Sequence, residues 1–141
     1  MDTATGLGSG APIAAAALVA AEVELVVVGG CALVLLDVAE SCSDLDVVPE
    51  PSAANLERLC SALDALGAAR PSLRTIAERS VSSATSPFGR IDLMLETARR
   101  EYRALAFDGS NCRVAGTVVR VAAVADVLRL RRMYSEADRG Q

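Results

Sequence analysis

The chain has 141 residues, a net charge of −4 and a sequence pI near 4.8; 52% of its residues are hydrophobic and 3% are aromatic. This size and composition predict one globular domain with a core of small aliphatic side chains. All 14 basic residues are arginine and histidine is absent, which excludes histidine general bases, Ser-His-Asp triads, P-loop lysines and His-ligated zinc. The acidic balance argues against a broadly basic nucleic-acid surface, although a local arginine cluster can still contact RNA or a phosphate.

The N-terminal residues 1–10 are rich in Gly, Ser and Thr, and we expect a flexible leader there, followed by a single domain over 11–141. The alanine-rich run 11–21 predicts a short helix, because a membrane span needs about 20 apolar residues. We therefore expect no membrane partner. The four cysteines lack C-x-x-C spacing, which is typical of reduced thiols in a cytoplasmic protein.

Residues 24–28 contain a continuous apolar run from Leu25 to Val28 and predict a strand buried on both faces. The run ends at Gly29 and Gly30, after which residues 30–39 predict a short helix. A glycine turn that opens a helix offers backbone N–H groups to a phosphate. This segment is therefore a candidate phosphate site.

A second strand is expected over 44–48, and it carries Asp44 and Asp46. Side chains at positions i and i+2 point to the same face of a strand, so these two carboxylates project side by side. Adjacent carboxylates repel each other unless a cation lies between them, and their hard oxygen atoms suit Mg²⁺. Together with the glycine turn, the pair predicts a Mg²⁺-nucleotide site.

The remaining residues continue the alternation of helices and strands, which predicts an α/β or α+β domain. Ser52 is a suitable N-cap for a helix that ends near Leu66, with Gly67 as its stop. The later expected elements are short edge strands over 70–76 and 80–85, a core strand over 88–95, a helix over 97–106, a hairpin over 112–121 that turns near Gly116, and a final helix over 123–136.

One acidic residue, Asp92, stands among apolar neighbours in the expected strand 88–95. A lone buried carboxylate is costly unless it is paired or bound to metal. If this strand lies beside 44–48, Asp92 completes a three-carboxylate cluster suited to two-metal phosphoryl-type transfer, in which it takes the proton of the attacking hydroxyl. Arg90 shares the face of Asp92, and it can pair with that acid or contact a phosphate.

Three segments carry a resemblance to a known family. They are VVVGGCALVLLDVAESCSDLDVVPEPSAANLERLCSALDALGA, FGRIDLML and RVAAVADVLRLRRM. They resemble the nucleotidyltransferase fold of the DNA polymerase β-like superfamily, in the small bacterial AbiEii-like or MenT-like form that often acts as the toxin of a toxin–antitoxin pair. The resemblance implies a mixed β-sheet flanked by helices, two Mg²⁺ ions, and transfer of a nucleoside monophosphate from an NTP to a hydroxyl acceptor.

The resemblance also implies roles for individual residues. Asp44, Asp46 and Asp92 would be the catalytic residues and metal ligands. The candidate nucleotide-binding residues are Gly29, Gly30, Cys31 through its backbone N–H, Ser43 and Arg90. Two positions depart from the family pattern, which commonly has Arg and Ser or Thr where this chain has Glu40 and Cys42. A glutamate at that place repels phosphates.

Three functions stay open at this point. The first is an active Mg²⁺-dependent nucleotidyltransferase whose acceptor is a tRNA end, a protein or a small molecule. The second is a catalytically impaired module that binds nucleotide or a protein partner such as an antitoxin, as Glu40 and Cys42 suggest. The third is an unrelated α/β domain with structural acids. Arg129, Arg131 and Arg132 are candidates for the basic residue that relatives carry in the last helix, whereas the arginines within 97–106 are interpreted as a solvated helix face.

Overall fold

The computed structural model of the protein describes residues 10–139, with side chains over 10–135. Most of the expected leader, residues 1–9, lies outside the described residues. The elements in chain order are α1 (Ala11–Ala20), β1 (Leu25–Val28), α2 (Gly29–Leu35), β2 (Leu45–Pro49), α3 (Ala53–Ala65), α4 (Leu73–Glu78), β3 (Val81–Ser86), β4 (Gly89–Met94), α5 (Leu95–Asp108), β5 (Ser110–Val114), β6 (Thr117–Val121) and α6 (Val124–Arg139).

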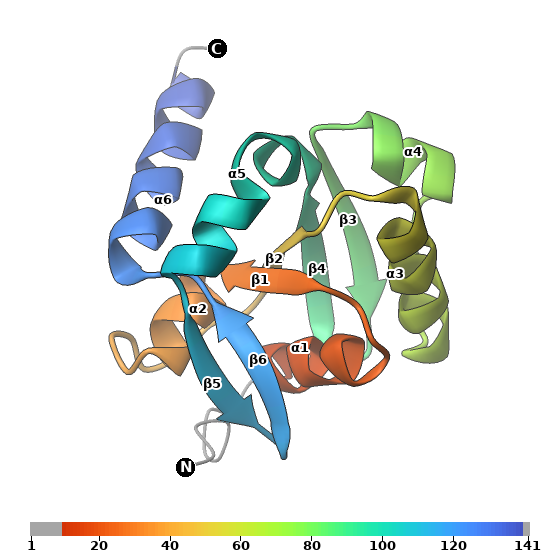
Figure 1. Cartoon of the computed structure of the whole chain (residues 1–141), viewed down its shortest axis with the longest axis horizontal. Coiled ribbons are helices and arrows are strands. Elements are labelled where there is room, and N and C mark those ends of the chain that lie inside the picture. Colours follow the sequence, from red (N-terminus) through yellow and green to blue (C-terminus); the bar gives the residue numbers. More distant parts are fainter. Residues whose placement is uncertain (1–9, 140–141) are drawn as a thin grey trace.

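Within the described residues, the six strands form one mixed sheet in the order β3-β4-β2-β1-β6-β5. The pairs β2–β4 and β1–β6 are parallel, and the other neighbouring pairs are antiparallel. Helices surround this sheet, and α6 stands at one side with its C-terminal end projecting beyond the strands (Figure 1). The predicted mixed sheet flanked by helices is confirmed.

The centre of the sheet is covered on both faces, whereas its β3–β4 side is covered on one. All four residues of β1 are buried, and α1 packs against β6 and β2 while α5 packs against β2 and β1. In β3 and β4 burial alternates, so that Ala84 and Ile91 lie in the core while Ser83 and Asp92 face the other way. This partly open polar face carries the candidate site.

Several predicted boundaries are confirmed by the backbone. The Ser52 Oγ accepts a hydrogen bond from the Asn55 N–H at 3.3 Å, and α3 ends before Gly67, whose φ is +81°. The hairpin turns at Ala115 and Gly116, both with positive φ. The predicted helix over 30–39 is shorter than expected: α2 ends at Leu35, and Asp37 adopts a left-handed φ of 63°.

The expected strand over 70–76 is wrong, because this segment contains α4. The Ser72 Oγ accepts from the Thr75 N–H at 3.1 Å and starts a helical turn. The predicted helix over 97–106 extends over Leu95–Asp108, but its backbone is broken at Glu101, where φ is −152° and ψ is 22°. The sequence pattern did not indicate this break.

A buried asparagine fastens α3 to the sheet. Asn55 is fully buried, and its Oδ1 accepts from the Glu24 N–H at 2.9 Å. Its Nδ2 donates to the carbonyls of Glu24 and Glu50, both at 2.8 Å. These residues flank the paired ends of β1 and β2, where Leu25 lies opposite Pro49. The amide therefore bonds to the Glu24 N–H and the Glu50 carbonyl, and it adds a second hydrogen bond to the Glu24 carbonyl, which also accepts from the Glu50 N–H at 3.0 Å.

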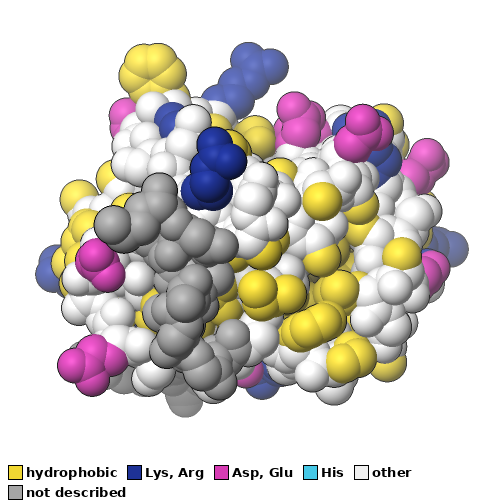
Figure 2. Space-filling model, turned by 90° about the horizontal axis from the view of Figure 1, so that it is seen from below, with side chains coloured by type: hydrophobic (Ala, Val, Ile, Leu, Met, Phe, Trp, Pro, Cys, Tyr) yellow, Lys and Arg dark blue, Asp and Glu magenta, His cyan; other side chains and the backbone are white. Residues whose placement is uncertain are grey.

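The surface is not uniformly polar. When the molecule is seen from below relative to Figure 1, many hydrophobic side chains gather near the middle of the face and most of the charged ones lie towards its rim (Figure 2). No helix described between residues 10 and 139 is both long and apolar enough to cross a membrane.

Candidate active site

Three polar side chains form a row across neighbouring strands. In the register of the sheet, Asp46 of β2 lies beside Asp92 of β4, and Asp92 lies opposite Ser83 of β3. On the other side of β2, Asp46 lies opposite Val28, the last residue of β1. The structure thus brings Asp92 beside Asp46, as predicted, because the strand that carries it pairs in parallel with β2.

Hydrogen bonds hold Asp92 in this row. The Ser83 Oγ donates to Asp92 Oδ1 at 2.6 Å, and the Arg90 Nη2 donates to Asp92 Oδ2 at 3.0 Å. The same Arg90 Nη2 lies 3.8 Å from Asp44 Oδ2. One guanidinium, whose side chain is 57% exposed, therefore pairs with Asp92 and Asp44 and acts on Asp46 through its charge alone. Water weakens all three effects.

The pKa of Asp46 is shifted from its ordinary value. Burial raises the pKa of its carboxyl to about 7, with further contributions from a hydrogen bond to Asp92 and from the negative charges of Asp92 and Asp44; Arg90 opposes the shift. A carboxyl with this pKa is partly protonated near neutral pH. A cation placed here would displace that proton.

Gly29 makes room for Asp46. Its φ is +68°, and a Cβ at this position would lie 2.1 Å from Asp46 Oδ2. Any larger residue would therefore collide with the carboxylate as well as strain the backbone. The sequence predicted a phosphate role for this glycine, but the close approach to Asp46 could not be read from it. Gly30 is different, since a Cβ there would meet Cys42 Cβ only at an ordinary 3.6 Å.

A cleft of about 540 Å³ opens in front of these strands. Among the predicted site residues, all of which are described, those that line it are Gly29, Gly30, Asp46, Arg90 and Asp92. Cys31, Ser43 and Asp44 do not line it. Cys31 is fully buried beside Cys42, and burial first, then the Cys42 thiol, raises its pKa. Ser43 is exposed, and its carbonyl packs close to Gly89.

One face of α6 closes the other side of the cleft. The lining residues Val127, Leu130, Arg131 and Tyr134 follow helical i, i+3, i+4, i+7 spacing. The Tyr134 hydroxyl is hydrogen-bonded to Thr97 Oγ1 of α5 at 2.5 Å. Sequence reasoning missed Tyr134, although this spacing could have placed it beside Arg131.

The structure separates the three arginines of α6. Arg129 donates to both carboxylate oxygens of Glu101, at 3.2 and 2.5 Å, and to Asp126 at 3.2 Å. Arg132 is exposed and does not line the cleft. Arg131 does line it, with Nη2 4.0 Å from the place that a Cβ on Gly30 would occupy. Arg131 is thus the cation of this helix that faces the glycine turn.

The carboxylates fit a metal bound together with a substrate better than a metal held by protein alone. In the part of the chain that the structure describes, no three His, Cys, Asp or Glu side chains converge on one point that could hold a metal ion. Asp46 and Asp92 are adjacent, whereas Asp44 faces Arg90. Mg²⁺ is usually bound by one or two carboxylates together with substrate phosphates and water. The pair of acids beside a glycine turn matches that requirement.

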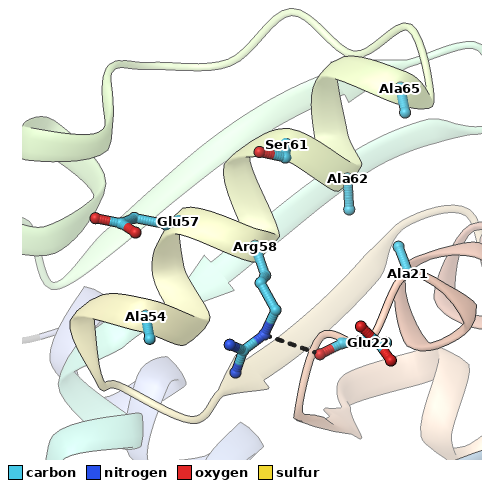
Figure 3. A pocket seen from close by; sticks show the side chains of 8 residues that line it. All are labelled: Ala21, Glu22, Ala54, Glu57, Arg58, Ser61, Ala62 and Ala65. Carbon is cyan, nitrogen blue, oxygen red and sulfur yellow. Dashed lines mark hydrogen bonds between the residues drawn. The ribbon is translucent and has the colours of Figure 1, made fainter.

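A second hollow of about 510 Å³ lies between α3 and the turn after α1 (Figure 3). Alanines form much of its wall, and the Arg58 side chain reaches across it, donating from Nε to the Glu22 carbonyl at 3.1 Å. None of the predicted site residues lies here. This hollow is therefore separate from the carboxylate site.

Comparisons with known proteins agree with this geometry at the level of the fold. No protein-family model matches the sequence, and no curated protein is significantly similar to it. The crystal structure of a proposed nucleotidyltransferase from Thermotoga maritima matches with a TM-score of 0.62 at 11% sequence identity, covering 91% of this chain and 84% of that one. The chain therefore has a nucleotidyltransferase fold, and at this identity the likeness extends to the fold alone.

Proposed function

We propose that the protein is a Mg²⁺-dependent nucleotidyltransferase that moves a nucleoside monophosphate from an NTP to a hydroxyl acceptor. The observation that carries the proposal is the Asp46–Asp92 pair, which lies in the wall of a cleft with more negative charge than Arg90 offsets. The nucleotidyltransferase fold supports it. So does the glycine turn that lines the same cleft.

In this proposal each residue has a defined task. Asp46 and Asp92 would hold Mg²⁺, with Asp44 available once it leaves Arg90. Two bound ions would supply charge neutralisation for the phosphates and would acidify the acceptor hydroxyl. Arg131 attracts the triphosphate. The acceptor oxygen attacks the α-phosphorus. The bond between the α-phosphorus and the oxygen that bridges it to the β-phosphorus breaks, and pyrophosphate leaves with the electron pair. Asp92 accepts the proton of the hydroxyl.

The acceptor and the biological role are finer proposals. The hydroxyl belongs to a tRNA end, a protein or a small molecule, and the chain acts as an AbiEii-like or MenT-like toxin with an antitoxin partner. The resemblance in sequence supports this role.

Thermal unfolding with Mg²⁺ and each NTP tests the proposal, because a ligand that binds only the folded state raises the Tm by mass action. We expect a Mg²⁺-dependent rise with at least one NTP, and its loss in the Asp44→Asn/Asp46→Asn variant. A matched control is Asp64→Asn, which removes an exposed carboxylate that pairs with Arg70 away from the cleft. Absence of any rise with every NTP contradicts the proposal.

A catalytically impaired binding module is the second candidate. Its specific support is Arg90, which already occupies the space between Asp92 and Asp44 at 3.0 and 3.8 Å, together with Glu40 and Cys42 in the preceding loop. This module would bind NTP without metal. Its signature is a rise in Tm with NTP that survives both EDTA and the Asp44→Asn/Asp46→Asn substitutions.

A further inference from the structure

Two of the four cysteines lie in contact behind the glycine turn. All four are free thiols. The Cys31 side chain is fully buried, and its thiol is hydrogen-bonded to the thiol of Cys42, which is partly exposed in the loop after α2. Among the described residues, Cys60 and Cys112 have no thiol neighbour, and the Cys112 thiol donates to the Leu35 carbonyl at 3.7 Å. The thiol–thiol contact therefore belongs to Cys31 and Cys42.

The two thiols of this pair are held to different degrees. Cys31 lies in the first turn of α2 and in the hydrophobic core, whereas Cys42 lies in the loop 36–44 that joins α2 to β2. A disulfide needs its sulfur atoms about 2.05 Å apart, which is closer than two hydrogen-bonded thiols stand. Because Cys31 is fixed by its helix and by the core, most of that approach has to come from Cys42 and its loop.

A movement of Cys42 towards α2 reaches the phosphate side of the cleft. Its Cβ lies 3.6 Å from the place that a Cβ on Gly30 would occupy, and Arg131 Nη2 lies 4.0 Å from the same place. Both Gly30 and Arg131 line the carboxylate cleft. Asp44, two residues after Cys42, lies 3.8 Å from Arg90. A bond that draws Cys42 onto α2 would therefore narrow the space beside Gly30 and restrain the segment through which Asp44 would leave Arg90.

The exposure of the two sulfur atoms sets the order in which they react. A small oxidant in solution reaches the partly exposed Cys42 before the fully buried Cys31. Cys31 is then the described thiol that touches Cys42 and can displace the oxidant from it. An accessible cysteine beside a second, resolving cysteine is typical of reversible redox pairs.

We propose that Cys31 and Cys42 form a reversible disulfide that closes the glycine turn to nucleotide, with a small-molecule disulfide such as oxidised glutathione as the oxidant. The Cys42 sulfur attacks this oxidant, and one glutathione leaves with the electron pair and takes up the thiol proton. The Cys31 sulfur then attacks the mixed disulfide at Cys42, and the second glutathione leaves in the same way. Two protein thiols are thus oxidised while one glutathione disulfide is reduced to two thiols. The effect on nucleotide rests on the proposed function, whereas the bond itself does not.

Mass spectrometry of the alkylated chain, after incubation with mixtures of reduced and oxidised glutathione, tests the bond. A glutamate-specific protease is required, because it cuts at Glu40 between the two cysteines, whereas no arginine lies between them. The wild type should give linked Cys31 and Cys42 peptides that dithiothreitol separates.

The matched control is Cys112→Ser, which also removes a partly exposed thiol and should still form the link. In Cys42→Ser the buried Cys31 should stay unmodified. Glutathione that remains on Cys42 without a link, a link that forms only in urea, or equal pairing of Cys42 with Cys112 would overturn the proposal.

The Mg²⁺–NTP rise in Tm measures the effect on the site. The linked wild type and the linked Cys112→Ser variant should lose most of this rise and regain it with dithiothreitol, whereas Cys42→Ser should keep it under both conditions. A full rise in the linked protein would overturn the closure of the glycine turn.

The two readouts separate this inference from the proposed function. If the link forms but the reduced protein shows no rise with any NTP, the transferase proposal fails, and the effect of the disulfide on nucleotide fails with it. If the rise is present and no link forms, the disulfide proposal alone is overturned.

Discussion

The two ends of the β1–β2 pair treat buried polar groups in opposite ways. At one end, the Asn55 side chain satisfies three backbone groups at 2.8–2.9 Å and is fully buried. At the other end, Asp46 and Asp92 lie side by side, and Arg90 balances them incompletely, so that the pKa of Asp46 is raised to about 7. The polar network at one end of the strand pair is thus complete, whereas at the other end the three carboxylates outnumber the arginine that pairs with them.

The difference separates a cluster that supports the fold from one whose excess negative charge would favour a bound cation. A satisfied buried amide stabilises the folded chain, because its removal leaves backbone groups without partners. Closely spaced carboxylates destabilise the chain until a cation arrives. Changes at the first end should therefore affect stability alone, and changes at the second should affect ligand binding first.

The largest effect is expected from Asp46→Asn. If this carboxylate holds Mg²⁺, its loss removes several kcal/mol of transition-state stabilisation, and NTP transfer should fall about 10²- to 10⁴-fold. The assay measures incorporation of labelled nucleotide into an acceptor, with Asp64→Asn as the control of equal charge change. Transfer by Asp46→Asn at the wild-type rate would show that the Asp46 carboxylate has no part in the reaction.

The next largest effect is expected from Asn55→Ala, which removes the side-chain partner of the Glu24 N–H and the Glu50 carbonyl and one of the two hydrogen bonds to the Glu24 carbonyl. We expect the free energy of unfolding to fall by about 3 kcal/mol, measured in urea, while the Mg²⁺–NTP rise in Tm is kept. Asn111→Ala is the control, since Asn111 is exposed and accepts from Arg120. Loss of NTP binding by a folded Asn55→Ala protein would show that the two ends are not independent.

Gly29→Ala should affect the carboxylate end alone, because its effect there is steric. The added Cβ meets Asp46 Oδ2, whereas Gly116→Ala introduces a similar positive-φ strain with nothing within 4 Å. We expect a stability loss of about 1 kcal/mol for Gly116→Ala and a larger one for Gly29→Ala, with the Mg²⁺–NTP effect lost only in the latter.

A double-mutant cycle then isolates the contact. Adding Asp46→Ala to Gly29→Ala removes the carboxylate that the Cβ meets, so the two losses of unfolding free energy should not add. Strict additivity would mean that Gly29 and Asp46 do not constrain each other in solution.

The smallest effect is a pH dependence of stability in metal-free buffer. Asp46 has a pKa of about 7 when folded against 3.8 for an ordinary Asp carboxyl, so the folded chain binds more protons between these values, and its contribution to stability decreases as the pH rises through them. Relative to Asp46→Asn, the wild type should lose a few degrees of Tm between about pH 5 and pH 8. Mg²⁺ with NTP should reduce this loss. An unchanged difference between the two proteins would show that Asp46 ionises normally.

Local patterns in the sequence were sufficient to predict the strands that bear the candidate carboxylates. The apolar run before Gly29, the Asp44-x-Asp46 spacing and the lone Asp92 each follow from strand periodicity and the cost of burying charge. Those rules predicted β1, β2 and β4 and the meeting of Asp46 with Asp92. The resemblance added the fold, which the structure and the neighbour from Thermotoga maritima confirm.

What the sequence did not reveal depends on contacts between distant segments. Asn55 looks like an ordinary helix residue until α3 is placed against Glu24, 31 positions away. The collision of a Gly29 side chain with Asp46 depends on strand pairing. Arg131 and Tyr134 can be chosen from their neighbours only when the face of α6 that meets the cleft is known. The segment that contains α4 was predicted as a strand from its apolar pattern, but the Ser72 cap starts a helix there.

The most direct test of the account is the position of a metal. Crystals grown with Mn²⁺ and a non-hydrolysable NTP analogue allow the metal to be located by its anomalous scattering. We expect a peak bonded to carboxylate oxygens of Asp46 and Asp92 and to the phosphates, with Arg90 turned away from at least one acid. A bound nucleotide with no metal at these carboxylates, and with Arg90 still joined to Asp92, would contradict it.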